Sequence, residues 1–210
     1  MKYKNARILI FCKAPVLGQV KTRLVPMLGE QQALVLYQEL TTRMISTCLE
    51  SELAPAQIWT TEDHAFFHTF GELGKVGHVR IQQGDNLGQR MQFALSTALL
   101  ESGVQRAILA GTDCPPVDKS YLDKALAALE DHDAVLGPTE DGGYGLIGLR
   151  KVQADYFSDI PWSTDSVCAD TCSRFNRNGL NWSLLPQIWD VDRPEDIMRY
   201  QQFCQTLPSR

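Results

Sequence analysis

The chain has 210 residues, of which 44% are apolar and 21% are charged, and this is the balance of an ordinary globular protein. Its net charge of −5 argues against a duplex nucleic-acid binder, which needs a strongly basic face, but leaves room for a local basic pocket that takes one small anion. No apolar run approaches the roughly 20 residues of a membrane span, and the run Ala6–Cys12 is too short and too charged for a signal-peptide core, so we expect a cytoplasmic protein with reduced cysteines.

Apolar periodicity divides the chain into alternating strands and helices. Seven strands are expected, at Ala6–Cys12, Ala56–Thr60, Val79–Gln82, Arg106–Ala110, Ala134–Gly137, Tyr144–Leu149 and Asn181–Pro186. Six helices are expected, at Glu30–Glu50, Asp63–Leu73, Leu87–Leu100, Lys119–Glu130, Thr164–Asn178 and Pro194–Cys204. Ser163 or Thr164 is expected to cap the fifth helix. This alternation predicts one α/β domain, residues 1–210, with a mostly parallel sheet and helices on both faces.

In such sheets ligands bind beyond the carboxyl ends of the strands, so the loops there are the first places to search. The loop after the first strand contains Lys13, Gly18, Lys21, Thr22 and Arg23. A polyphosphate needs backbone N–H groups, which a glycine turn exposes, and cationic side chains. The loop is not a Walker A motif, because no glycine stands directly before Lys21. We favour a phosphate-binding loop over a surface loop with scattered charges.

Two acidic sites follow predicted strands. Asp113 comes directly after the buried run Arg106–Ala110, where a carboxylate suits Mg²⁺ or Mn²⁺, and its alternative is a turn or cap aspartate. Asp190 and Asp192 follow the last strand and face the same side if the segment is extended. One of them could complete a metal site with Asp113, although Asp192 is also placed to cap the helix that begins near Pro194.

A glycine-rich segment between Gly137 and Gly148 forms a third candidate site. Gly143, Gly145 and Gly148 match Gly-x-Gly-x-x-Gly, but the residues after them read as a strand, which argues against a dinucleotide-binding turn. The segment is better interpreted as a turn that brings the backbone close to a substrate and presents Asp141 or the neighbouring glutamate to it. A carboxylate there would orient a hydroxyl or act as a general base.

Four ordered motifs between about Arg7 and Tyr200 carry a family resemblance: Lys13-x-Pro15-x-x-Gly18-x-Val-Lys21-Thr-Arg-Leu24, Gly111-Thr-Asp-Cys-Pro115, Gly137-Pro-x-x-Asp141-Gly-Gly-Tyr144 and Trp162-Ser-Thr164. They resemble the GT-A-like nucleotide-diphospho-sugar transferases, a family usually labelled as glycosyltransferases, some of them linked to arsenosugar biosynthesis. The resemblance implies a GT-A, Rossmann-like fold in which the Lys13–Arg23 loop and Asp113 form the nucleotide and metal end.

The Lys-Thr-Arg-Leu piece is also similar to small-molecule nucleotidyltransferases, in which a late aspartate, here Asp192, shares the metal with the earlier one. Metal-dependent glycosyltransferases of this fold carry Asp-x-Asp after the central strand, whereas this chain has Asp113-Cys-Pro. This departure weakens the case for glycosyl transfer relative to nucleotidyl transfer.

These observations lead to one set of expected roles. Asp113 and Asp192 are expected to hold Mg²⁺ or Mn²⁺, and Asp141 and Lys21 to serve catalysis. Phosphate or nucleotide binding is expected at Lys13, Gly18, Lys21, Thr22, Arg23 and Arg90, and the acceptor side at Gly142, Gly143, Tyr144 and Trp162. The first hypothesis is glycosyl transfer from a nucleotide sugar to a small-molecule acceptor. The alternatives are nucleotidyl transfer from a nucleoside triphosphate to a phosphorylated small molecule, and a nucleotide-binding module without turnover.

Two further pairs have the spacing of zinc ligands, Cys168 with Cys172 and His64 with His68. Both fall in predicted helices, where residues four apart share a face. A cysteine is a common core residue and a helical histidine pair is often only surface, so we do not expect zinc.

Overall fold

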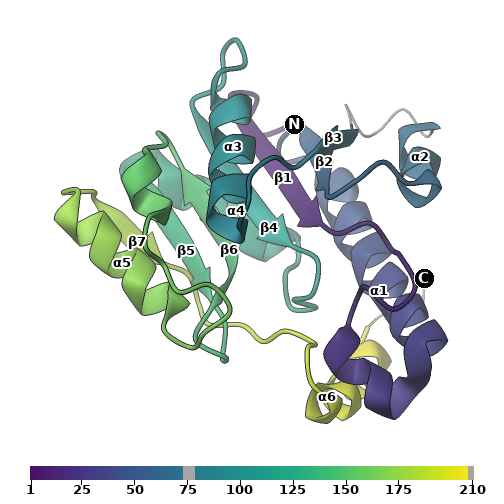
Figure 1. The fold of residues 1–210 in the computed structure, drawn as a ribbon. Coiled ribbons are helices and arrows are strands. Elements are labelled where there is room, and N and C mark those ends of the chain that lie inside the picture. The colour runs from purple at the N-terminus through teal and green to yellow at the C-terminus, as the bar shows by residue number, and fades with distance from the viewer. Residues whose placement is uncertain (73–78, 208–210) are drawn as a thin grey trace.

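The structure, a computed structural model, describes residues 1–72 and 79–207 (Figure 1). Its strands are β1 (Ala6–Cys12), β2 (Ala56–Thr60), β3 (Val79–Ile81), β4 (Arg106–Gly111), β5 (Ala134–Pro138), β6 (Tyr144–Leu149) and β7 (Trp182–Leu184). Its α-helices are α1 (Val25–Ser51), α2 (Ala65–Glu72), α3 (Leu87–Leu99), α4 (Lys119–Asp131), α5 (Val167–Arg177) and α6 (Pro194–Gln205). Two short 3₁₀ helices are η1 (Thr22–Leu24) and η2 (Ala154–Phe157). Within these described ranges, no helix combines the length and apolar character that crossing a membrane requires.

The strands form one sheet in the order β3-β2-β1-β4-β6-β5-β7. Strands β3, β2, β1 and β4 run parallel, and β5 pairs in parallel with β7. Strand β6 is inserted between β4 and β5 and is antiparallel to both. It can lie beside β5 because a short turn joins them, whereas a parallel pair needs a long crossover. The predicted α/β fold with a mostly parallel sheet is therefore confirmed, with β6 as its one reversed strand among those described.

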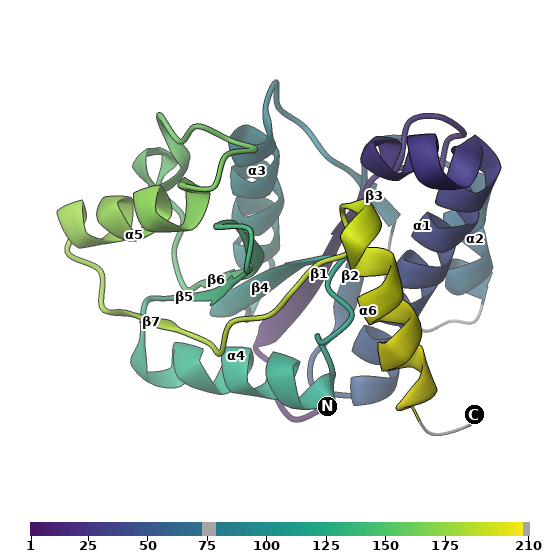
Figure 2. The same ribbon diagram turned by 90° about the horizontal axis from the view of Figure 1, so that it is seen from below.

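Helices cover both faces of the sheet, as expected from the alternating pattern (Figure 2). In β1, Ile8 and Ile10 belong to a core shared with α1, α2 and α4, while Leu9 between them belongs to the core shared with α3 and α5. This alternation follows from the period of two in a strand. Helix α6 packs instead against α1, where Leu40 and Ile197 share a smaller core.

The starts of two helices show more than the sequence prediction gave. Helix α1 is counted from Val25, with Pro26 in a short first turn, but its backbone is non-helical at Gly29, whose φ is 77°, so the main helical segment starts at Glu30 as predicted. Helix α5 begins at Val167 rather than Thr164, and neither Ser163 nor Thr164 caps it. The Thr164 hydroxyl instead donates to the carbonyl of Pro161, which holds the preceding turn.

Other boundaries lie close to the prediction. Helix α2 begins at Ala65, two residues after the expected Asp63, and the expected end at Leu73 lies outside the described residues. Asn86 caps α3, because its side chain accepts a hydrogen bond from the backbone N–H of Gln89 at 3.0 Å.

Glu101, just after α3, ties three parallel strands together at the end of the sheet opposite to the carboxyl ends of β1 and β4. Its carboxylate accepts hydrogen bonds from Arg7 of β1 at 2.6 Å, Gln57 of β2 at 2.6 Å and Arg80 of β3 at 2.9 Å. Burial raises the pKa of this carboxyl, but the hydrogen bonds from Gln57 and Arg7 outweigh burial and hold it below its usual range. The ionised form is therefore the one that the fold stabilises.

We expect Glu101→Gln to lower the free energy of unfolding at pH 7 by about 1–3 kcal/mol, since it weakens hydrogen bonds to a charged group. The wild-type contribution is complete above the unfolded pKa near 4.5 and disappears as the pH falls through the lowered folded pKa. Urea unfolding should therefore show a difference in the free energy of unfolding between the wild type and Glu101→Gln that is smaller in acid than at pH 7. The exposed Glu62→Gln is the matched control. A difference independent of pH would contradict the role of the carboxylate.

Candidate functional site

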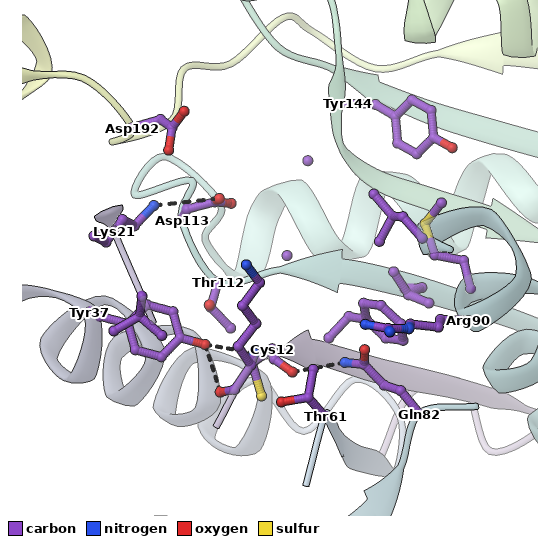
Figure 3. A pocket seen from close by; sticks show the side chains of 18 of the residues that line it. Cys12, Lys21, Tyr37, Thr61, Gln82, Arg90, Thr112, Asp113, Tyr144 and Asp192 are labelled. Atoms are coloured by element: carbon purple, nitrogen blue, oxygen red, sulfur yellow. Dashed lines mark hydrogen bonds and ion pairs between the residues drawn. The ribbon is translucent and has the colours of Figure 1, made fainter. Parts of the chain in front are cut away.

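A pocket of about 460 Å³ opens at the carboxyl ends of β1, β2 and β4 (Figure 3). It lies where the strand order departs from β1 in two directions, toward β2 and toward β4, and this is the usual ligand position in open α/β sheets. Eight of the residues singled out from the sequence line it, namely Lys13, Lys21, Thr22, Arg23, Arg90, Asp113, Tyr144 and Asp192.

The loop after β1 places Lys21 inside the protein rather than in open solvent. Lys21 has a left-handed backbone, with φ 48° and ψ 40°, between the buried side chains of Val20 and Leu24. Its side chain is 6% exposed, and its Nζ donates to the carbonyl of Val191 at 2.6 Å and lies 3.6 Å from Oδ2 of Asp113. Lys21 therefore links the first loop, the end of β4 and the segment before α6.

Asp113 lies just beyond β4, and the segment before α6 runs alongside it. The backbone N–H of Val191 donates to the carbonyl of Asp113 at 2.9 Å. Asp192 also lines the pocket and forms an ion pair with Arg23. It does not cap α6, since the N-cap is Arg193 and the capping carboxylate is Asp196. The turn that follows β4 and the last loop of the chain thus bring two of the predicted acidic residues to one pocket.

Asp190 adds a third carboxylate to this neighbourhood. Burial raises the pKa of Asp190 to about 7, with further contributions from the negative charges of Asp113 and Asp141, and Lys21 opposes them. Such an excess of negative charge is the electrostatic setting in which a cation binds. Among the residues that the structure describes, however, no group of three or more His, Cys, Asp or Glu side chains is arranged to hold a metal on its own.

Sequence reasoning did not single out Gln82, Thr61 or Tyr37, which also line the pocket. Tyr37 of α1 donates to the carbonyl of Lys13 and accepts from its N–H, both at 2.8 Å. The backbone N–H of Ala14 donates to the hydroxyl of Thr61 at 3.0 Å. Gln82 directly follows β3. Thr61 and Gln82 could have been found in the sequence, because each is a polar residue at the carboxyl end of a strand. Tyr37 could not, because the helical pattern of apolar residues does not indicate where its hydroxyl points.

Comparison with protein families gives one match. Residues 44–164 match the family DUF2064, described as "Uncharacterized protein conserved in bacteria". The chain belongs to this family. A relative of known name is the 3-phospho-D-glycerate guanylyltransferase of Phenylobacterium zucineum (strain HLK1), which is 29% identical over 128 residues. That match covers 57% of this chain and 55% of the guanylyltransferase, so the chain spans about half the length of this relative.

Solved structures agree on the fold. A protein from Desulfovibrio desulfuricans G20, provisionally named a nucleotide-diphospho-sugar transferase, is 34% identical with a TM-score of 0.80, and the match covers 90% of this chain and 83% of that one. The CTP complex of CMP:2-keto-3-deoxy-manno-octonic acid synthetase is 12% identical with a TM-score of 0.63, over 97% of this chain and 100% of that one. This DUF2064 protein therefore has the nucleotide-diphospho-sugar transferase fold that the sequence motifs suggested.

Five residues that the sequence placed in the site do not line the pocket, namely Gly18, Asp141, Gly142, Gly143 and Trp162. The carboxylate of Asp141 accepts from the hydroxyl of Thr139 at 2.5 Å and from the N–H of Gly143 at 3.1 Å, so it closes its own turn. It still lies near enough to Asp190 to raise the pKa of that carboxyl.

Close packing of neighbouring groups explains the glycines at positions 142 and 88. Gly142 has a φ of 88°, and a Cβ there would lie 1.9 Å from the carbonyl oxygen of Asp165. A Cβ at Gly88, in the first turn of α3, would lie 2.5 Å from the indole of Trp162. Trp162 therefore packs over the start of α3, partly buried against the core, instead of lining the acceptor side as expected.

Tyr144 lines the pocket with its ring, but its hydroxyl is turned away (Figure 3). The hydroxyl is buried beside Thr171 of α5, near the thiols of Cys168 and Cys172, and burial is the main cause of its raised pKa. The hydroxyl therefore stays protonated at neutral pH and contacts α5 rather than the pocket.

Proposed function

We propose that this DUF2064 protein is a metal-dependent nucleotidyltransferase that joins the nucleotidyl group of a nucleoside triphosphate to a phosphorylated small molecule. The observation that carries the proposal is the meeting of Asp113 and Asp192 with the cationic loop at one pocket. The guanylyltransferase among the relatives supports the same reaction class.

The chemistry of the carboxylates fits a hard divalent cation. Mg²⁺ prefers oxygen ligands and is commonly held by one or two carboxylates together with substrate phosphates. Two carboxylates near Lys21, without a complete protein cage in the described residues, match that requirement. Asp113 would hold the ion with Asp192 or Asp190. When bound, Mg²⁺ or Mn²⁺ neutralises charge on the phosphates and stabilises the transition state of phosphoryl transfer.

The protein's own groups would bind and orient the two substrates. An oxygen of the acceptor phosphate attacks the α-phosphorus, the bond from that phosphorus to the β-phosphate bridging oxygen breaks, and pyrophosphate leaves with the electron pair. Lys13 and Arg23 lie at the pocket and would contact phosphate oxygens directly. Lys21 is already paired with Val191 and Asp113, so it would act from one side of the phosphates and position the carboxylates at the same time.

The test is a turnover assay with ATP, GTP, CTP and UTP, Mg²⁺ or Mn²⁺, and a panel of phosphorylated small acids that includes 3-phosphoglycerate. We expect pyrophosphate release in step with formation of a nucleotide-capped product, and loss of both on adding a chelator. Nucleotide-diphosphate release from a nucleotide sugar, without pyrophosphate from any triphosphate, would contradict the proposal. Tight nucleotide binding without turnover across the panel would instead favour a non-catalytic module.

A second candidate is glycosyl transfer from a nucleotide-diphospho-sugar. The provisional name of the 34% identical relative favours it. The same pocket and charges would bind the diphosphate of such a donor. The sequence Asp113-Cys-Pro counts against it, because Cys114 is buried and offers no second carboxylate beside Asp113.

A further inference from the structure

The orientation of the Gln82 carboxamide is fixed by two backbone carbonyl groups. Its Nε2 donates to the carbonyl oxygen of Cys12 at 2.8 Å and to that of Trp59 at 2.9 Å. Flipping the amide would bring its oxygen against two other oxygens, so the nitrogen must be the atom that faces the two carbonyls. Both N–H groups of Gln82 are therefore used within the sheet.

Its Oε1 is consequently a pure acceptor that is available to a ligand. It points into the cavity in Figure 3, and Gln82 lines the pocket. No donor within residues 1–72 and 79–207 is seen to bond this oxygen, whereas the nitrogen of the same amide has two partners. An acceptor in this state favours a ligand that presents an N–H group.

A cationic donor lies on the same wall. Nε of Arg90 donates to the carbonyl of Gly84 at 2.9 Å, which ties the guanidinium to the backbone two residues beyond Gln82. Arg90 also lines the pocket. A fixed guanidinium favours a carbonyl oxygen as its partner, as in the common pairing of arginine with the keto oxygen of guanine. The wall thus offers an acceptor from Gln82 and a donor from Arg90.

From this pairing we propose that Gln82 is a specificity-determining residue for the nucleobase, accepting a hydrogen bond from the imino N–H of a base that has a keto group beside it. Guanine and uracil present this edge. Adenine has no imino N–H and no keto oxygen, and cytosine presents an unprotonated ring nitrogen in that place. The inference rests on the proposed nucleotide-binding function and deepens it by naming the class of base.

The wall is also shaped to keep Gln82 in place. Gly84 has a φ of 131°, and a Cβ there would lie 2.6 Å from Cβ of Gln89. The side-chain oxygen of Gln89 accepts from the N–H of Asp85 at 2.8 Å, so the loop after Gln82 is closed by its own contacts. A preorganised acceptor discriminates more strongly than a mobile one, because a wrong base leaves it without a partner.

Base analogues test the inference on the unmodified protein, where folding is not at issue. Calorimetry in the presence of Mg²⁺ would compare GTP, ITP, UTP, ATP, N1-methyl-GTP and inorganic tripolyphosphate. We expect GTP and ITP, which share the keto–imino edge, to bind alike, and N1-methyl-GTP and ATP to bind about tenfold more weakly, as one lost hydrogen bond predicts. The comparison of GTP with UTP distinguishes the two sources of the edge.

Variants then locate the effect. Gln82→Met should bring GTP down to the affinity of N1-methyl-GTP and leave tripolyphosphate unchanged, while the exposed Gln83→Met should change neither. Gln82→Lys keeps donors for the two carbonyls and lacks an acceptor. It should therefore also abolish the difference in affinity between GTP and N1-methyl-GTP, even if the methionine variant folds poorly.

Two failures are distinguishable. If the wild-type protein binds nucleotides but prefers ATP or CTP, or binds N1-methyl-GTP as well as GTP, the role of Gln82 is wrong and the proposed function stands. If no nucleotide and no tripolyphosphate binds, the proposed function is wrong and the inference falls with it.

Discussion

Replacing Asp113 with asparagine is expected to lower turnover by about a hundredfold or more and to remove the dependence of nucleotide affinity on Mg²⁺ or Mn²⁺. The substitution keeps the size of the side chain and the hydrogen bond from the backbone N–H of Val191 to the backbone carbonyl of residue 113. It removes one negative charge from the pocket. Turnover assays and calorimetry with and without the metal would measure the two effects.

The fold should survive this change. The Asp113 side chain is 44% exposed, so its pairing with Lys21 contributes little to stability, and the free energy of unfolding should stay within about 1 kcal/mol of the wild type. Asp131→Asn, at the exposed end of α4, is the matched control and should leave turnover unchanged. If Asp113→Asn kept full activity and metal-dependent affinity, the metal would have to be held elsewhere.

The position of Asp113 at a strand end could be predicted from the sequence. The buried run that ends in Gly111 identifies the carboxyl end of a strand from local composition alone. In a parallel sheet the carboxyl ends of neighbouring strands lie on the same side of the sheet. The first loop and Asp113 follow β1 and β4, which the structure shows to be adjacent, as the family resemblance implied. The alternation of strands with helices predicted the α/β fold because it too depends only on local patterns of apolar residues.

Other features depend on contacts that no local pattern encodes. Lys21 and Val191 are 170 positions apart in the chain. The positive charge of Lys21 is evident from the sequence, but the burial of its side chain depends on that distant contact and could not be predicted. The apolar, glycine-rich run at residues 144–149 indicates a strand but not its direction, and the reversal of β6 was therefore not predictable. It leaves the Tyr144 ring at the pocket and the hydroxyl against α5, away from any substrate in the pocket.

The second large effect is expected for Lys21→Met, which keeps the apolar stem and removes the ammonium group. The carbonyl of Val191 would lose its buried donor, and the carboxylates of Asp113 and Asp190 would lose the cation that moderates their repulsion. We expect the free energy of unfolding to fall by about 1–3 kcal/mol and turnover to fall at least about tenfold. Lys4→Met, at an exposed position, is the control and should change neither quantity.

Ligand binding separates a phosphate contact from a purely structural role for Lys21. If the ammonium group of Lys21 also contacts phosphate, affinity for tripolyphosphate and nucleoside triphosphates should fall more than affinity for the free nucleoside. The free nucleoside has no phosphate for the ammonium group to contact. A variant that only loosens the segment before α6 would lower all three affinities to a similar degree. Equal losses would therefore assign Lys21 to positioning Asp113 and Val191, and unequal losses would assign it to both tasks.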